Sequence, residues 1–504
     1  MILDAREANQ IFARPPGVAL CTSEALGNIE INAEEANSTV YLGVADIADA
    51  FHRFRAPTWM RRYFALERPV KAGRLGLVGK VIDGRVLTKS CLVWPMFKSL
   101  PMGFSWSLYF CQEAGVNLMS GLPCLGGSRL MSDRSGATVV SGSSRTVSHH
   151  YVYVDNLGAM SGSRPAVEDF VAQAKAEFGS RGLVIHEAEI FDGVAEVLGV
   201  VVDGKDHITR ISPKRLARVR AALSHLLGLK RVPGKVLEII LGHCTFCALA
   251  CRPLLSVFHS TYAFVRRHAC DSDVLWPAVR SELQAFRALT LLAIGDWSLA
   301  WSPYVSASDA SPWGYGISSA IWPPSVVAQV GRVSERSRFR RSTGLAPRES
   351  ALTSAGFKNV GDTWEPEETY DSCLANALGE WEIDEDFPEV PAEWLRGERW
   401  KACVGRRWKH REDILILEAR TLVSALARLV EGRRAQGSRF LFLSDNMSVV
   451  LAFSRSRARD FKLLCQVRKF AGYLLAKGNR ASVRWVPSEL NSSDIPSRIF
   501  DPPV

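Results

Sequence analysis

The sequence of 504 residues lacks the features of a membrane or secreted protein. It holds no uninterrupted apolar run long enough to cross a bilayer, and Asp4, Arg6 and Glu7 interrupt any signal peptide at its start. Its eleven cysteines are an odd number spread thinly over the chain, which is typical of reduced thiols and not of a disulfide framework. We therefore expect a soluble, intracellular protein located in the cytoplasm, the nucleus or both.

Acidic residues are scarce except in one segment. Residues 361–398 hold thirteen Asp/Glu against the single Arg396, which gives this segment a net charge of −12. Because the whole chain has a net charge of +10, the rest of the chain has a net charge of +22. A basic surface of this size favours a polyanionic partner, most often nucleic acid, over a merely soluble basic protein. The length predicts two to four domains.

Two aspartates stand at the ends of apolar strands in the first third of the chain. The stretch HHYVYVDNLG places Asp155 after four β-branched or aromatic residues, and Asp46 follows the apolar run of residues 41–45. An ordinary Asp-Asn hairpin turn is the simpler interpretation of the first motif. Two such carboxylates could instead share a pair of divalent cations, as two-metal phosphoryl transfer requires.

Three stretches in order resemble the palm of a reverse transcriptase. ADIADAF resembles the first catalytic motif of that family, LPMGFSWSLYFCQ its LPQG-type second motif, and YVDN its YxDD box. The resemblance implies that Asp46 and Asp155 ligate metal. It also implies four nucleotide-binding residues: Phe51, Met102, Gly103 and Asn156. Phe51 would be the aromatic gate that excludes a 2′-hydroxyl, and Met102 would lie beside the template-pairing nucleotide.

Three departures from this family pattern weaken the polymerase motifs. Asn156 replaces the second aspartate of the box and brings no charge to a metal. In GLVIHEAE, which resembles the fourth motif, Glu189 stands where a lysine is expected. The opening MILDAREAN begins as an apolar, strand-like segment and resembles the returning strand of the fingers, but the basic residues that usually precede that strand lie off the start of this chain. Residues 121–148 are rich in Gly and Ser without periodicity, and we expect them to be a flexible insertion.

A basic amphipathic helix is predicted after the segment EVLGVVVDG, which resembles the primer-grip region. Leu216, Val219, Leu223, Leu226 and Leu227 recur at helical spacing, with Ser212 as the expected cap. Either this helix lies along a nucleic-acid backbone as a thumb, or its charged face is simply solvated. The residues that would contact phosphates are Lys214, Arg215, Arg218 and Arg220.

A group of thiols with one imidazole lies further along, at His243, Cys244, Cys247 and Cys251. Their spacings place the cysteines on one helical face among apolar residues, and no second Cys/His pair follows nearby. Buried structural thiols in a packed helix are therefore expected, rather than a zinc site.

A second set of acids lies in the last 200 residues. They stand on an apolar strand, a long helix, the end of a strand and a segment before a terminal turn: Asp309, Glu418, Asp445 and Asp494. This half resembles a ribonuclease H domain, and SDN with NSSDIPSR resembles retroelements of the tyrosine-recombinase (DIRS) type, with Gypsy-like elements as the alternative. The resemblance implies that the four acids hold two metals. Residues 322–410 are expected to form a surface excursion of low order outside the family core.

These expectations combine into an α/β protein: a fingers remnant at 1–40, a palm with an antiparallel sheet at 41–205, a helical thumb and connection at 206–296 and a ribonuclease H-like domain at 297–504. The expected activity is RNA-directed DNA polymerisation with cleavage of the RNA–DNA hybrid, using two Mg²⁺ or Mn²⁺ per site. The expected partners are an RNA template, a DNA primer, the hybrid and deoxynucleoside triphosphates, with no membrane. A non-catalytic nucleic-acid-binding relic and a ribonuclease H-type nuclease alone stay open as alternatives. With no protease-type DTG or DSG triplet and no integrase zinc head in the sequence, any other mobility functions are expected elsewhere.

Overall fold

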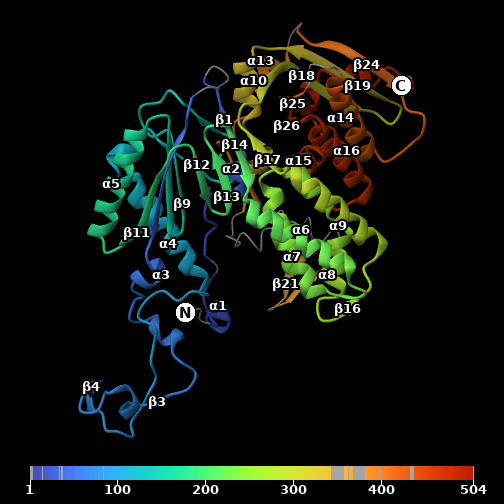
Figure 1. The fold of residues 1–504 in the computed structure, drawn as a ribbon. Coiled ribbons are helices and arrows are strands. Elements are labelled where there is room, and N and C mark those ends of the chain that lie inside the picture. The colour runs from blue at the N-terminus through green and yellow to red at the C-terminus, as the bar shows by residue number, and fades with distance from the viewer. Residues whose placement is uncertain are drawn as a thin grey trace.

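A computed structural model describes most of the chain: residues 4–13, 15–32, 35, 38–82, 84–341, 357–360, 363–366, 381–396, 399–431 and 436–502. Within these ranges it shows an α/β fold built around several sheets (Figure 1). No helix in the described ranges combines the length and the apolar character needed to cross a membrane. The ten cysteines there are all free thiols.

The first sheet has five strands in the order β11-β2-β10-β9-β7. Its strands are antiparallel except for the parallel pair β7 and β9. Their bounds are β2 Tyr41–Ile47, β7 Arg129–Leu130, β9 His149–Tyr153, β10 Asn156–Ser161 and β11 Ile185–Phe191. Helices α4 (Ser105–Ser120) and α5 (Arg164–Ser180) share a core with one face of this sheet. Gly43 allows α5 to approach closely, since a Cβ there would lie 2.5 Å from Val167 Cγ1.

The opposite face of the first sheet joins the largest hydrophobic core. Leu42, Tyr151 and Met160 meet there with a second sheet, ordered β12-β13-β14-β17, and with a helical region. The second sheet comprises β12 Val194–Val197, β13 Val200–Asp203, β14 Ile208–Ile211 and β17 Ile294–Asp296. The helical region comprises α6 Pro213–Gly228, α7 Gly234–Leu249, α8 Ser260–Arg267 and α9 Pro277–Leu289, with a short pair of strands, β15 Val232–Pro233 and β16 Ser272–Asp273.

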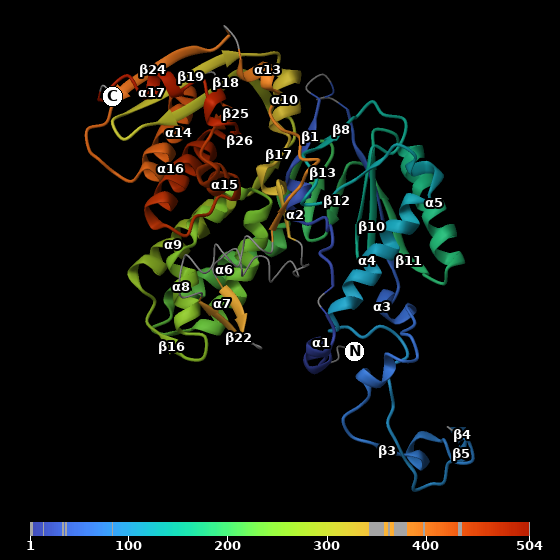
Figure 2. The same ribbon diagram turned by 180° about the vertical axis from the view of Figure 1, so that it is seen from behind.

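The C-terminal sheet has the order β24-β19-β18-β25-β26 and mixes antiparallel and parallel pairs. Its strands are β18 Ala300–Ala310, β19 Gly314–Ile321, β24 Lys401–Arg407, β25 Ser438–Ser444 and β26 Arg480–Trp485. One core holds α14 (Ile414–Val430), α15 (Met447–Arg455) and α16 (Phe461–Lys477), and another holds α10 (Pro324–Gly331) and α13 (Ala392–Leu395). Figure 2 shows this domain from behind, with α17 (Asp494–Ser497) beside the sheet. Two further pairs are β20 Phe339–Arg341 with β23 Trp381–Ile383, and β21 Phe357–Val360 with β22 Thr363–Pro366.

An arm of residues 57–98 projects from the first half of the protein (Figures 1 and 2). It carries only short pairings, β3 Val70–Lys71 with β6 Leu92–Val93 and β4 Val81–Ile82 with β5 Arg85–Val86. Nine Lys/Arg and two Asp/Glu lie in the arm, so much of the net positive charge of the chain is located there. Trp59 and Trp94 are more than half exposed on it.

The beginning of the chain differs from the sequence prediction. Residues 6–11 form a helix, α1 (Arg6–Ile11), where the resemblance of MILDAREAN implies a returning strand. The apolar start of that segment, residues 1–3, lies outside the described residues. Residues 23–31 form α2 (Ser23–Gly27) and β1 (Ile29–Ile31), whose side chains lie in the largest core.

The prediction of a flexible insertion at residues 121–148 is wrong. The segment supplies β7 and β8 (Thr138–Val140), and β8 pairs in parallel with β1. Asp133 explains its order, because its carboxylate accepts hydrogen bonds from Thr22 N at 2.9 Å and Ala25 N at 3.2 Å at the start of α2. A contact that spans more than 100 residues leaves no periodic signal in the sequence.

The expected low order of residues 322–410 is also wrong for their described parts. Val327 and Val330 of α10 pack with β18 and β25 side chains, and β24 is a strand of the C-terminal sheet. Trp394 and Leu395 of α13 belong to the same core. Residues 342–356, 361–362, 367–380 and 397–398 of this prediction lie outside the described residues.

Candidate active sites

The first candidate site lies at one end of the first sheet, where β2 meets the β9–β10 hairpin. Asp46 of β2 pairs directly with Asn156 of β10, and Ile47 N donates to Asp155 O at 2.9 Å. The two predicted aspartates therefore lie next to each other, as the motifs require.

The hairpin is held by a residue that the sequence analysis did not identify. Gln112 of α4 is fully buried, and its Oε1 accepts from Val154 N at 2.9 Å while its Nε2 donates to Val152 O at 2.9 Å and Ala19 O at 3.0 Å. These bonds fix the turn although Val154 adopts a φ of 59°, a left-handed conformation unfavourable for a β-branched residue. The position of Asp155 thus depends on a glutamine more than 40 residues away.

The groups around Asp46 shift its pKa in opposite directions. Burial and the neighbouring Asp155 raise the pKa of Asp46 above its ordinary value, while a hydrogen bond from Asn156 and the nearby His186 lower it. His186 Nδ1 lies 3.6 Å from Asp46 Oδ1. Asn156 Oδ1, the atom an amide would offer a metal, accepts a hydrogen bond from Tyr151 Oη at 2.9 Å. This site holds two carboxylates and an amide oxygen that is already engaged.

The other predicted nucleotide-binding residues lie on two segments near the hairpin. Phe51 of α3 (Ala50–Arg53) is half-buried in a cluster that contains Val154, one residue before Asp155. Met102 is 36% exposed. Gly103 has a φ of 112°, and its carbonyl accepts from Asn9 Nδ2 at 3.0 Å while Asn9 Oδ1 accepts from Ser105 N at 2.9 Å. Asn9 is thus a clamp on this turn that sequence reasoning missed.

Glu189 lies further from Asp46 along the strand pair than Glu187 does. In the register of β11 against β2, Glu187 is opposite Asp46 and Glu189 is opposite Val44. Glu189 is exposed, whereas the Glu187 carboxylate contributes to the raised pKa of Asp46.

The second candidate site gathers three of the four predicted acids. One carboxylate oxygen from each of Asp309, Glu418 and Asp445 lies within 4.8 Å of the others, an arrangement that can hold a metal ion. Asp309 is near the end of β18, Glu418 is on α14, and Asp445 follows the last residue of β25. Because β18 and β25 are parallel, their carboxyl ends bring these acids to one edge of the sheet.

Asp494 lies beside this group but outside the three-oxygen cluster. It is the first residue of α17 and accepts from Arg498 Nε at 2.7 Å. Its charge contributes to the raised pKa of Asp309, so it remains within electrostatic reach.

Hydroxyl groups orient two of the three clustered acids. Ser497 of α17 donates to Asp309 Oδ2, and Ser488 Oγ donates to Asp445 Oδ2 at 2.7 Å. Trp485 Nε1 also donates to the backbone carbonyl of Asp445 at 2.8 Å. The two serines stand in the segment PSELNSSDIPSR, whose serine content is the one signal that could have indicated them.

The chemistry of this cluster fits divalent cations. Burial, with the charges of Asp309 and Asp445, raises the pKa of Glu418 to about 9, and burial with the charges of Asp445 and Asp494 raises the pKa of Asp309 to about 6. Among the described residues, neither Glu418 Oε2 nor Asp445 Oδ1 has a hydrogen-bond partner. Buried carboxylate oxygens that repel one another and lack donors are the hard ligands that Mg²⁺ and Mn²⁺ prefer.

The four basic residues predicted for nucleic-acid contact on α6 divide into two pairs. Lys214 and Arg218 are exposed. The Arg215 guanidinium lies 4.1 Å from the Phe246 ring centroid, and Arg220 donates to the Arg287 carbonyl. The second pair thus packs α6 against α7 and α9. Ser212 precedes α6, but its side chain accepts no capping hydrogen bond from the described residues, which corrects the expected cap.

The cysteine group lies in the hydrophobic core, as expected. Cys244 and Cys247 of α7 are fully buried, and burial raises the pKa of Cys247 to about 11. His243 is exposed on another side of the helix. These thiols pack as apolar side chains.

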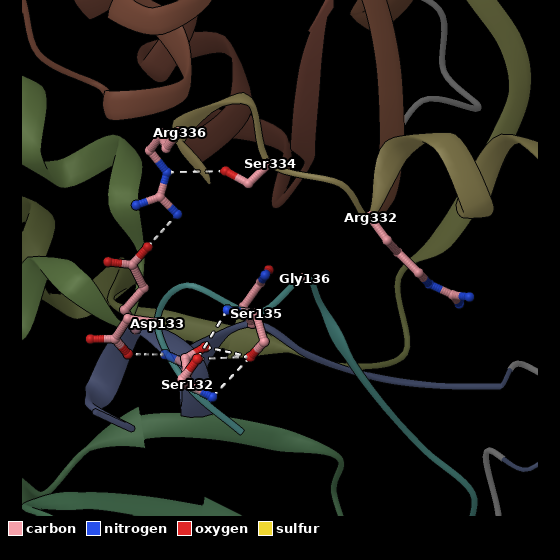
Figure 3. A pocket seen from close by; sticks show the side chains of 10 residues that line it. Ser132, Asp133, Ser135, Gly136, Arg332, Ser334 and Arg336 are labelled. Atoms are coloured by element: carbon pink, nitrogen blue, oxygen red, sulfur yellow. Dashed lines mark hydrogen bonds and ion pairs between the residues drawn. The ribbon is translucent and has the colours of Figure 1, made fainter. Parts of the chain in front are cut away.

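Buried ion pairs join the two halves of the protein. Asp133 and Arg336 line a cavity of about 20 Å³, enough for a single water. Figure 3 shows Asp133 below and Arg336 above in this pocket. Burial alone would raise the pKa of Glu24 at this junction, but Arg252 and Arg336 lower it below its ordinary value. Glu30 of β1 likewise accepts from Arg332 Nε at 2.9 Å. These contacts connect α2 and β1 with the C-terminal domain.

No protein-family model and no curated protein matches the chain. Three solved structures of a foamy viral protease-reverse transcriptase are similar to it at 12% identity. The form denoted dRH with double-stranded DNA has a TM-score of 0.41 over 96% of this chain and 62% of that one. The complex with RNA/DNA hybrid has a TM-score of 0.39 over 99% and 70%, and the complex with double-stranded DNA 0.38 over 97% and 75%. The chain thus spans about three fifths of the first of these proteins, and the case for its function rests on the two carboxylate sites.

Proposed function

We propose that the chain is an RNA-directed DNA polymerase of a retroelement, of the DIRS or Gypsy-like type, that also cleaves the RNA of RNA–DNA hybrids. The observation that carries this proposal is the convergence of Asp309, Glu418 and Asp445 within 4.8 Å, in the same chain as the adjacent Asp46 and Asp155. The domains proposed are those of the sequence analysis, with the palm at 41–205 and the nuclease at 297–504.

In the nuclease half, the three clustered acids and the neighbouring Asp494 would hold two divalent cations. When bound, these cations supply the positive charge that activates water and stabilises the scissile phosphate. Ser497 and Ser488 hold Asp309 and Asp445 in orientation.

In the polymerase half, Asp46 and Asp155 would hold cations beside the primer 3′-hydroxyl and the incoming triphosphate. Gln112 fixes the hairpin that carries Asp155, and Phe51 lies against that hairpin, where an aromatic ring can exclude a 2′-hydroxyl. Met102 and Gly103 would border the nucleotide, while exposed Lys214 and Arg218 would contact phosphates without reading sequence.

A nuclease without polymerase activity is the second candidate. The engaged amide of Asn156 favours it, because the first site then offers a metal the two aspartates Asp46 and Asp155, whereas three carboxylates converge at the second. The relic without either activity is disfavoured by the donor-free oxygens of Glu418 and Asp445, since nothing else in the described residues compensates their burial.

Paired assays separate these candidates. Primer extension on an RNA template and cleavage of an RNA–DNA hybrid are measured with Mg²⁺ or Mn²⁺ for the wild type, Asp155→Asn and Asp445→Asn. The proposal expects both activities in the wild type, loss of extension alone in the first variant and loss of cleavage alone in the second. Cleavage without extension would support the nuclease, and salt-sensitive hybrid binding without either activity would support the relic.

A further inference from the structure

A run of exposed basic residues leaves the edge strand of the C-terminal sheet. From Arg399 to Arg411 the sequence contains six Lys/Arg and no acidic residue. β24 is the terminal strand in the order of its sheet. Exposed basic side chains occupy its last two residues and the segment just beyond it: Arg406, Arg407, Lys409 and Arg411. We name these four residues the basic ledge. None of them belongs to the two carboxylate sites or to the basic face of α6.

The ledge is fixed to the turn between β18 and β19. Trp408 N donates to Trp313 O at 2.9 Å, and Trp408 Nε1 donates to Ser311 O at 3.1 Å. The Trp408 and Tyr315 rings lie 4.5 Å apart, and the Arg411 guanidinium lies 4.3 Å from the Trp313 ring centroid. Trp408 and Trp313 therefore hold the ledge backbone and the Arg411 side chain in place. The basic groups of the ledge are then its main chemical feature at the surface.

The same edge of the sheet carries the clustered acids. β18 ends one residue after Asp309, β25 ends one residue before Asp445, and β24 ends at Arg407. Since β24 and β18 are both antiparallel to β19, they run in one direction and end together.

The register gives the separation between ledge and carboxylates. Asp309 is opposite Gly316, and Gly316 is opposite Gly405, the residue before Arg406. Two strand spacings are about 10 Å. Each strand of a duplex presents a phosphate about every 3.4 Å along the axis, so a separation of this order corresponds to a few nucleotides of backbone.

We propose that the basic ledge binds the phosphodiester backbone of the duplex cut at the Asp309, Glu418 and Asp445 site. Arg406 and Arg407 are then positioning residues that set where the strand lies, and they read charge and not base sequence. This inference rests on the proposed nuclease function, because it names the surface that delivers substrate to that site.

The test compares two double variants with equal loss of charge. Arg406→Ala/Arg407→Ala removes half of the ledge. Lys175→Ala/Arg428→Ala removes one exposed cation from α5 and one from α14, where residue 428 lies ten residues, about 15 Å, along the helix from Glu418. Binding of a short RNA–DNA hybrid is measured by fluorescence anisotropy in EDTA between about 50 and 200 mM salt.

The ledge variant is expected to bind the hybrid about tenfold more weakly and to reduce the slope of log K against log salt by about 1. Successive side chains of a strand project to opposite faces of the sheet, so the double substitution removes about one phosphate contact on the face that binds the duplex. The control pair should stay within about twofold, and Arg406→Lys/Arg407→Lys should retain most of the affinity. Equal weakening in both double variants, or no change in the ledge variant with an unaltered melting temperature, would overturn the proposal.

Cleavage assays distinguish failure of the ledge from failure of the nuclease. With Mg²⁺ the ledge variant should raise KM and leave kcat within about twofold, because the carboxylates are untouched. If the wild type cleaves hybrid and the ledge variant binds and cleaves like it, only the ledge is refuted. If no chain cleaves but the ledge variant alone loses binding in EDTA, the ledge stands and the nuclease does not.

Discussion

The two carboxylate sites differ in how much uncompensated negative charge each one concentrates. At the C-terminal sheet, three acids converge, Asp309 and Glu418 are buried, and two oxygens lack donors within the described residues. At the first sheet, the side chain of Asp46 is 33% exposed, and both a hydrogen bond from Asn156 and the nearby His186 offset its repulsion from Asp155. The second site therefore concentrates more unpaired negative charge than the first, where part of the charge on Asp46 is already offset by its neighbours.

The largest effect is expected from Asp445→Asn. Asparagine keeps the shape but removes one of three converging charges, so hybrid cleavage should fall by on the order of 10²–10³-fold, as loss of several kcal/mol of charge stabilisation predicts. Primer extension by the same variant should stay within about twofold. Hybrid cleavage by Asp445→Asn at the wild-type rate would show that the charge of Asp445 is not needed for cleavage, and the proposed difference between the two sites would be wrong.

An added carboxylate at the first site should reduce the difference in cation affinity between the two sites. Asn156→Asp adds a carboxylate opposite Asp46, and primer extension at limiting Mg²⁺ should rise by about tenfold, as a gain of ~1.4 kcal/mol in cation binding predicts. Titration of extension rate against Mg²⁺ measures this gain. Hybrid cleavage is the internal control, and an equal rise in cleavage would show that the change acts on the whole protein.

A smaller effect is expected at the hydroxyl that orients Asp309. Ser497→Ala removes one donor to that carboxylate, and a net hydrogen-bond contribution of about 1 kcal/mol predicts a fall in cleavage of about fivefold. Ser497→Thr should recover most of it. A loss as large as that of Asp445→Asn would mean that Ser497 itself contacts substrate.

The smallest effect concerns stability in the absence of divalent cations. Because the pKa of Glu418 is raised to about 9 from an ordinary 4.5, the folded state binds its proton more tightly than the unfolded chain does. The contribution of Glu418 to stability in EDTA should therefore be fully present below about pH 4.5 and be lost as the pH rises towards 9. Glu418→Gln should flatten this decline and raise Tm at pH 8 by about 2–4 °C, as ~1 kcal/mol in a domain of this size predicts.

Mg²⁺ should reverse the loss of stability that ionisation of Glu418 causes at high pH. Cations bind the ionised carboxylates of the folded state, so the rise in wild-type Tm on adding Mg²⁺ should be larger at pH 8 than at pH 6. Glu113→Gln, at an exposed carboxylate of α4, is the control and should behave as the wild type. A difference in Tm between the wild type and Glu418→Gln that does not grow with pH in EDTA would contradict the buried state of Glu418.

The sequence predicted the elements that carry chemistry, because each motif combines a local pattern with its acid. The strand before Asp155, the strand of Asp309, the long helix of Glu418 and the strand before Asp445 all lie where their periodicity indicated. The helical thiols of α7 were predicted for the same reason.

Contacts between distant segments could not be predicted. Gln112, Asn9 and Ser497 act through hydrogen bonds that span 42 to 188 residues, and polar residues of this kind give no periodic signal. The same reason explains the wrong predictions for α1 and for residues 121–148, where Asp133 caps a helix far back in the chain. Arg220 was assigned to nucleic acid because its spacing on α6 did not reveal the carbonyl of Arg287.

Manganese binding followed by electron paramagnetic resonance tests the contrast between the two sites most directly, with no dependence on activity. Free Mn²⁺ is measured during titration of the wild type, Asp155→Asn and Asp445→Asn at pH 7.5. The contrast predicts a class of tight sites that persists in Asp155→Asn and is lost in Asp445→Asn. Tight sites that survive Asp445→Asn, or that disappear with Asp155→Asn, would contradict it.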